Sequence, residues 1–200
     1  LGAKTPTLSG GGTLGNTHVI LPNKAYRKLL LTSITVGYVS TSLANSGLDV
    51  DANSSVTSLT VGHTTPVSIA SGITLSGGIT VTAGSIRLDE AGTLGANVSM
   101  SGGTLDVDKT LTLSGALTQS GNIEIDVKAG EVLTYSGAAV NLGAYTLQMS
   151  GGGTLSNTYA FALNDASSKL QLNSITVGQV STSLTNLCLD SVATSTAPTL

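Results

Sequence analysis

Residues 105–126 read LDVDKTLTLSGALTQSGNIEID, and this stretch decides the fold. It contains the triplets Leu105–Val107, Leu111–Leu113 and Ile123–Ile125, in which two apolar residues flank a polar one. Such alternation is typical of a short β-strand, whose outer two side chains point to the same face. Ser-Gly pairs separate the last two triplets, and glycine adopts turn conformations that other residues avoid. The stretch therefore predicts very short strands joined by tight corners.

The same alternation continues along the chain. Further triplets of this kind are Leu59–Val61, Ile73–Leu75, Ile79–Val81, Ile86–Leu88, Leu147–Met149 and Leu170–Leu172. Helical periodicity with caps is absent. Strands of three residues do not form a stable hairpin sheet alone, but they become stable when each coil stacks on the next. We therefore predict an all-β fold, a parallel β-helix or β-solenoid.

The spacing of the triplets predicts how the coils stack. Leu105–Asp108 and Ile123–Asp126 have the same pattern, and we expect them to pair, with Leu105 opposite Ile123. Leu105, Val107, Ile123 and Ile125 would then form adjoining layers of one core. Coils of roughly 18 to 22 residues would give about nine to eleven coils. Antiparallel β-sandwich repeats are the alternative, because short strands and turns also suit them.

A long internal repeat organises the chain. Ser150–Leu155 repeats Ser9–Leu14, and Ser174–Gly178 repeats Ser33–Gly37, at one constant separation without insertion. We expect residues 1–141 to be one complete unit and residues 142–200 to be the first part of a second, in one continuous solenoid. The chain would then be part of a longer tandem array. Its main partners would be neighbouring repeats, with self-association end to end or side by side.

The composition argues against several classes of function. Only 10% of the residues are charged, against about 25% in a typical soluble domain. The net charge is −3, and no basic patch is present to bind nucleic acid. No stretch approaches the roughly 18 apolar residues of a membrane span. Aromatic residues, which stack on sugars, make up 3% of the chain, and we expect no enzyme. A polysaccharide-binding or polysaccharide-cleaving β-helix remains an alternative.

Four acidic residues form the one candidate metal site. They are Asp106, Asp108, Glu124 and Asp126, which alternate with core residues and would face outward on adjacent coils. Carboxylates on neighbouring strands offer the oxygen ligands that Ca²⁺ prefers. The competing interpretation is a solvated acidic face, neutralised in part by Lys109 and Lys128. We expect no other cofactor.

Threonine-rich segments raise a further alternative, an ice-binding β-solenoid. Thr80–Thr82 and Thr110–Thr112 have the required alternation. From the sequence we expect that such pairs do not recur coil after coil in one column. Strand propensity explains threonine equally well.

Several segments together resemble the right-handed parallel β-helix repeats of giant bacterial adhesins and autotransporter passengers. These are SGGGTLSNT at 150–158, LTLSGALTQSG at 111–121 and VNLG at 140–143. The resemblance implies export to the cell surface or the extracellular space, and a role as stalk, adhesin or fibre subunit that contacts surface or matrix ligands. No polar cluster is evident in both units, which favours a structural repeat over a catalytic one. We therefore expect a structural or adhesive segment of a long tandem-repeat protein.

Overall fold

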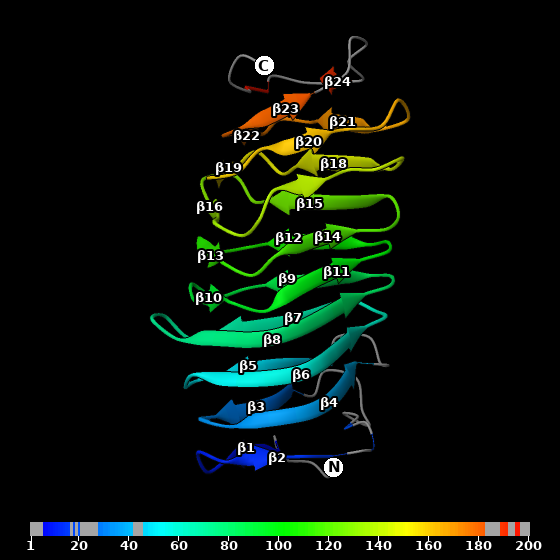
Figure 1. The fold of residues 1–200 in the computed structure, drawn as a ribbon. Coiled ribbons are helices and arrows are strands. Elements are labelled where there is room, and N and C mark those ends of the chain that lie inside the picture. Colours follow the sequence, from blue (N-terminus) through cyan, green and yellow to red (C-terminus); the bar gives the residue numbers. More distant parts are fainter. Residues whose placement is uncertain are drawn as a thin grey trace.

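The chain folds into an elongated stack of coils in the computed structural model, which describes residues 6–16, 18, 20, 28–41, 46–182, 189–191 and 195–196. These residues form 24 strands and no helix. Every strand pairs in parallel with the strand above or below it, and β1 and β24 lie at opposite ends of the stack (Figure 1). The predicted parallel β-solenoid is confirmed, and antiparallel sandwich repeats are excluded.

The first sheet runs the length of the stack and has ten strands. They are β1 (Thr7–Ser9), β3 (Lys28–Thr32), β5 (Gly47–Val50), β7 (Thr65–Ile69), β9 (Ser85–Leu88), β12 (Thr104–Val107), β15 (Ile123–Val127), β18 (Thr146–Ser150), β21 (Lys169–Leu172) and β24 (Leu189–Ser191). Each strand belongs to one coil. The described residues form about eight coils, slightly fewer than the nine to eleven predicted.

The second sheet has eleven strands and divides into two branches at β8. Its main path contains β2 (Thr13–Leu14), β4 (Thr35–Thr41), β6 (Ser54–Val61), β8 (Thr74–Val81), β10 (Thr93–Leu94), β13 (Leu111–Leu113), β16 (Val132–Tyr135), β19 (Thr154–Asn157) and β22 (Thr176–Val177). The start of β8 pairs with β10, whereas its end pairs with β11 (Asn97–Met100), which in turn pairs with β14 (Leu117–Gln119). Long curved strands in the early coils thus become two shorter strands and a corner in later ones (Figure 1).

A third sheet has three strands, β17 (Val140–Asn141), β20 (Phe161–Leu163) and β23 (Val180–Thr182). The aromatic side chain of Phe161 packs inside the solenoid against Tyr135 of the second sheet, with ring centroids 5.8 Å apart. These two are the largest fully buried side chains of the described residues. Tyr135 keeps its hydroxyl group satisfied, because that oxygen accepts the Leu117 N–H at 3.2 Å. These two aromatic rings therefore fill the core beside the third sheet.

Apolar residues fill the interior in columns that run from coil to coil. Ile86, Leu105, Ile125 and Met149 occupy one such column, and each is 0% exposed. The alternation seen in the sequence produces this column, because every second side chain of a strand points inward. Burial of each large aliphatic side chain contributes roughly 1.5–3 kcal/mol. The four core residues predicted from residues 105–125 are all buried, with Ile123 the most exposed at 4%.

The predicted register of β12 against β15 is wrong. Leu105 pairs with Ile125, an offset of 20, and not with Ile123. The shortest coils place residues 19 apart in register, as for Lys28 and Gly47, and the longest place them 24 apart. The preceding coil has an offset of 19, and the one additional residue lies between β14 and β15. Because the error is an even number, the inward and outward faces of these strands stay as predicted.

Corner glycines allow neighbouring coils to approach closely. At Gly115, an added Cβ atom would lie 1.9 Å from the carbonyl oxygen of Ala96 in the preceding coil. No real Cβ tolerates that distance, so any other residue would force the two coils apart. Glycine is therefore required at this corner by coil packing.

Corresponding residues of the two copies occupy equivalent places in the stack. Thr7 pairs with Leu30, and their counterparts Gln148 and Gln171 pair in the same way. Ser33 and Ser174 share a left-handed backbone conformation, with φ of 51° and 53°. In the first sheet, β18 lies seven coils after β1. The internal repeat therefore corresponds to a whole number of coils.

Candidate functional site

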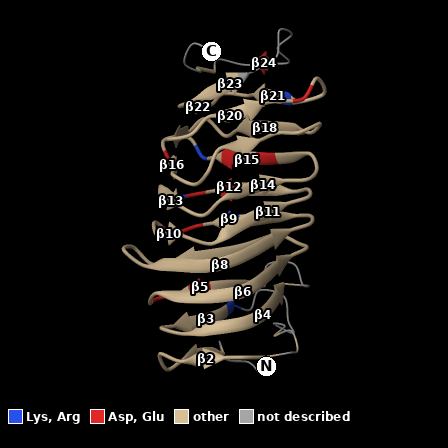
Figure 2. Ribbon diagram, in the orientation of Figure 1, with Lys and Arg blue, Asp and Glu red and all other residues tan. Residues whose placement is uncertain are grey.

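Charged residues of the strands gather on one face of the solenoid. All of them lie in the first sheet, whereas the described strands of the second and third sheets contain no Asp, Glu, Lys or Arg (Figure 2). They are Lys28, Asp49, Arg87, Asp106, Glu124, Asp126, Lys169 and Asp190. The solenoid thus has one charged face, the outer surface of the first sheet, and other faces that carry hydroxyl and amide groups.

Ion pairs connect successive coils on the charged face. Lys28 Nζ lies 2.8 Å from Asp49 Oδ1 and donates a hydrogen bond to Ser68 Oγ at 2.6 Å. Farther along, Asp108 lies 3.9 Å from Arg87 Nε and 3.5 Å from Lys128 Nζ. Exposed pairs of this kind contribute at most about 1 kcal/mol each. Their main effect is to balance charge between neighbouring coils.

The structure places the four predicted calcium ligands on this face but gives them different partners. Asp106 and Asp126 are in register on adjacent strands. Asp108, which follows β12, pairs with the cations described above. Glu124 accepts hydrogen bonds from other side chains of the face. Among the described residues, no group of three or more His, Cys, Asp or Glu is arranged to hold a metal ion. The calcium site stays a prediction, and this geometry adds no support to it.

Burial and mutual repulsion perturb two of these carboxyl groups. Partial burial, followed by the charges of Asp108 and Asp126, raises the pKa of Asp106, although Arg87 opposes the shift. Partial burial, followed by the charges of Glu124 and Asp108, raises the pKa of Asp126. Both groups therefore hold a proton more strongly than an ordinary aspartate does.

Hydroxyl side chains form ladders on the uncharged faces. One ladder runs from β4, β6 and β8 into the branch of the second sheet and consists of Ser40, Thr60, Thr80, Ser99 and Thr118, which are in register on successive coils. Another on the main path consists of Thr74, Thr93, Thr112, Thr134 and Ser156. Single hydroxyl residues, serine as well as threonine, therefore recur in one column, which the sequence did not predict; these ladders are not the Thr-x-Thr pairs considered from the sequence. Variable corner lengths hid these ladders in the sequence.

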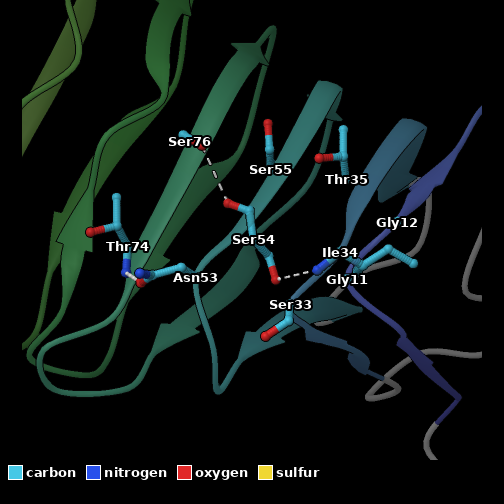
Figure 3. A pocket seen from close by; sticks show the side chains of 10 residues that line it. All are labelled: Gly11, Gly12, Ser33, Ile34, Thr35, Asn53, Ser54, Ser55, Thr74 and Ser76. Atoms are coloured by element: carbon cyan, nitrogen blue, oxygen red, sulfur yellow. Dashed lines mark hydrogen bonds between the residues drawn. The ribbon is translucent and has the colours of Figure 1, made fainter.

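A hydroxyl-lined hollow of about 550 Å³ lies on the outer side of β4, β6 and β8. Its polar lining includes Thr35, Asn53, Ser54, Ser55, Thr74 and Ser76, on neighbouring strands and corners (Figure 3). Much of this polarity joins coils to each other. Ser54 Oγ accepts the Ile34 N–H at 3.3 Å, and Asn53 Oδ1 accepts the Thr74 N–H at 2.9 Å. The polar groups of the hollow therefore serve mainly to hold neighbouring coils together.

A second groove, of about 410 Å³, lies on the charged face along β12, β15, β18 and β21. Thr104, Glu124, Gln148 and Gln171 line it, and they are in register with one residue on each coil. Asn122 and Ile123 also contribute. The sequence contained a usable signal, because the middle residue of each apolar triplet points outward. Without the true register, however, these residues could not be aligned.

Two asparagines that sequence reasoning missed share a contact in the two copies. Asn157 Nδ2 donates to the carbonyl oxygen of Gln179 at 2.7 Å, and Asn157 Oδ1 accepts the Gln179 N–H at 2.8 Å. Asn16, its counterpart in the first copy, donates to the carbonyl oxygen of Tyr38 at 2.9 Å. A polar contact to the backbone is thus reproduced in both copies. It ties one coil to the next and has no catalytic geometry.

Comparison with protein families, with curated proteins and with solved structures finds no match to this chain. Within the described part of the chain, no helix is long and apolar enough to span a membrane. The functional argument therefore depends on the geometry of the solenoid and its faces.

Proposed function

We propose that the chain is a structural and adhesive rod segment of a long tandem-repeat protein of the cell surface or extracellular space. One observation carries the proposal: a copy of the repeat corresponds to seven whole coils, and pairs such as Thr7–Leu30 and Gln148–Gln171 have the same register. A further copy can then stack on the last coil of the one before it, without a change of face. Such an array grows in length by simple addition of units.

The proposal assigns no catalytic role to the chain. The ion pairs and asparagine contacts described above connect coils, and they supply rigidity along the rod. Low charge and Gly-rich corners suit a spacer in which the surface residues differ between copies while the core residues stay the same. Export and display at the surface are supported by the resemblance to adhesin repeats, and antibody labelling of intact cells that express the parent protein would test them.

Rod growth can be measured on chains that carry one, two and three copies. Seven coils at about 4.8 Å each predict that every added copy lengthens the particle by about 34 Å, with no change in cross-section. Small-angle scattering and electron microscopy report both quantities. A matched control carries a flexible Gly/Ser linker between two copies and should give bent particles. Bent or compact particles from the directly joined copies would contradict the proposal.

The hydroxyl ladders favour a second candidate, an ordered-water or ice-binding face. Thr80, Ser99 and Thr118 are exposed and in register, so their hydroxyl groups repeat at the spacing of the coils. Inhibition of ice recrystallisation by the purified chain would support this function. Ser99→Lys should abolish the effect, whereas Gln171→Lys on the charged face should leave it intact. An absence of inhibition by the wild-type chain would remove this candidate.

A further inference from the structure

The groove along β12, β15, β18 and β21 has a lining that coil stacking does not require. Two of its residues, Gln148 and Gln171, correspond to Thr7 and Leu30 in the first copy. The same strand pairing forms with either set of side chains. The fold therefore does not need amide groups at these positions. The two amide groups on neighbouring coils are therefore specific to this groove and absent from the equivalent positions of the first copy.

The carboxylate of Glu124 is held in place at the centre of the groove. It accepts hydrogen bonds from Gln148 Nε2 at 3.0 Å, Ser150 Oγ at 2.7 Å and Thr104 Oγ1 at 3.3 Å. Three donors, from the coils on either side, orient the carboxylate and shield its negative charge. The geometry is thus set before any ligand arrives, which lowers the entropic cost of binding.

Unused hydrogen-bonding capacity remains on the amide groups. Gln148 binds Glu124 through its nitrogen, which directs its carbonyl oxygen away from that bond. Among the described contacts, the Gln171 side chain makes no hydrogen bond, so these two glutamines do not form an amide ladder with each other. The groove thus offers both donors and acceptors, in line along the rod.

The charge of the lining decides which ligands fit. One shielded carboxylate is the only charged group among the residues that line the groove. Phosphate, sulfate and carboxylate ligands would find no cation among these lining residues. A cation would find only Glu124, whose oxygens already accept three hydrogen bonds. A neutral ligand rich in hydroxyl groups matches the mixture of amide, hydroxyl and carboxylate groups.

The shape of the groove favours an extended ligand. Its lining residues repeat once per coil, at the spacing of about 4.8 Å between strands. That spacing is comparable with the length of one sugar ring.

We propose that this groove binds a neutral, extended glycan whose axis lies parallel to the rod. The inference gives a ligand class to the adhesive role proposed above, and it rests on that role for its biological setting. Binding and rod growth are measured separately. A chain that binds no glycan but lengthens by the expected increment would overturn only the present inference.

The test uses the purified chain on an array of neutral oligosaccharides of glucose, xylose, mannose and galactose, with sulfated and uronic-acid oligosaccharides for comparison. Binding to one or more neutral glycans is expected, and calorimetry then gives the affinity. Gln171→Ala should weaken binding by at least about tenfold, because one or two hydrogen bonds are lost. This variant should fold normally, since the Gln171 side chain makes no described hydrogen bond.

Thr118→Ala, which alters an exposed residue on another face, serves as the matched control and should bind like the wild type. Gln148→Ala tests the second amide, and its melting temperature shows whether loss of the Glu124 hydrogen bond has disturbed the fold. Absence of binding to every neutral glycan would overturn the inference. So would a preference for the charged oligosaccharides, or undiminished binding by Gln171→Ala.

Discussion

Asp106 and Asp126 lie side by side, in register on adjacent strands of the charged face. Two carboxylates in this arrangement repel each other whenever both are ionised, and partial burial adds to the cost. The pKa of each is raised in the folded chain, most of all by that burial. In the unfolded chain the strands separate and the ordinary pKa returns. Both groups therefore make folding less favourable at neutral pH.

These two carboxyl groups should accordingly make the chain more stable as the solution is made moderately acidic, against a smaller opposite effect of Glu131, whose pKa is lowered by hydrogen bonds from Thr110. A raised pKa means that the folded state binds more protons than the unfolded state, so stability falls as pH rises through that pKa. Melting temperatures between about pH 7 and pH 4 should rise from the first to the second value. Asp126→Asn should be more stable than wild type at pH 7 and should show a smaller rise. Glu90→Gln, at an exposed position, controls for net charge. A flat profile for the wild-type chain would contradict the assignment.

Ile125 tests the packing of the core. Its side chain is fully buried between Leu105 and Met149 of the neighbouring coils. Ile125→Ala should lower the free energy of unfolding by about 2–5 kcal/mol, because it leaves a cavity that rigid coils cannot close. Chemical denaturation gives this value, and Thr118→Ala is the surface comparison. A loss below about 0.5 kcal/mol would place Ile125 outside the core.

Gly115 tests the close approach of coils at a corner. Gly115→Ala should destabilise the chain by at least about 2 kcal/mol, because the new Cβ would overlap the backbone of Ala96. Gly12→Ala is a matched control, since a Cβ there has no atom within 4 Å. The control should change stability by less than about 0.5 kcal/mol. Equal effects of the two substitutions would show that the Gly115 corner is wider than described.

The calcium prediction has its own measurement. A ligand that binds only the folded chain raises its melting temperature as the ligand concentration increases. If Ca²⁺ binds at Asp106, Asp108, Glu124 and Asp126, millimolar Ca²⁺ should raise the melting temperature of the wild type and not that of Asp126→Asn. Unchanged melting of the wild type would end the hypothesis.

The sequence predicted which way the side chains face far better than how the coils align. Alternation in Leu105–Val107 assigns the inward positions without knowledge of any other coil. Alignment depends on the length of every corner, and the corners vary so that coils place paired residues 19 to 24 apart. Thr80 and Ser99 could therefore be assigned to the surface but not to one ladder. For the same reason, the pairing of Glu124 with Gln148 required the structure.

The whole number of coils in a copy also affects how a gene for such a protein can change. Unequal recombination between similar repeats removes or adds one copy, which here means seven complete coils. The coils on either side of the removed or added copy then pair in the same register as before. The two copies already show this, because Gln148 pairs with Gln171 as Thr7 pairs with Leu30. The length of the rod can thus change by whole copies, in steps of seven coils, and each resulting protein keeps the coil register that it needs to fold.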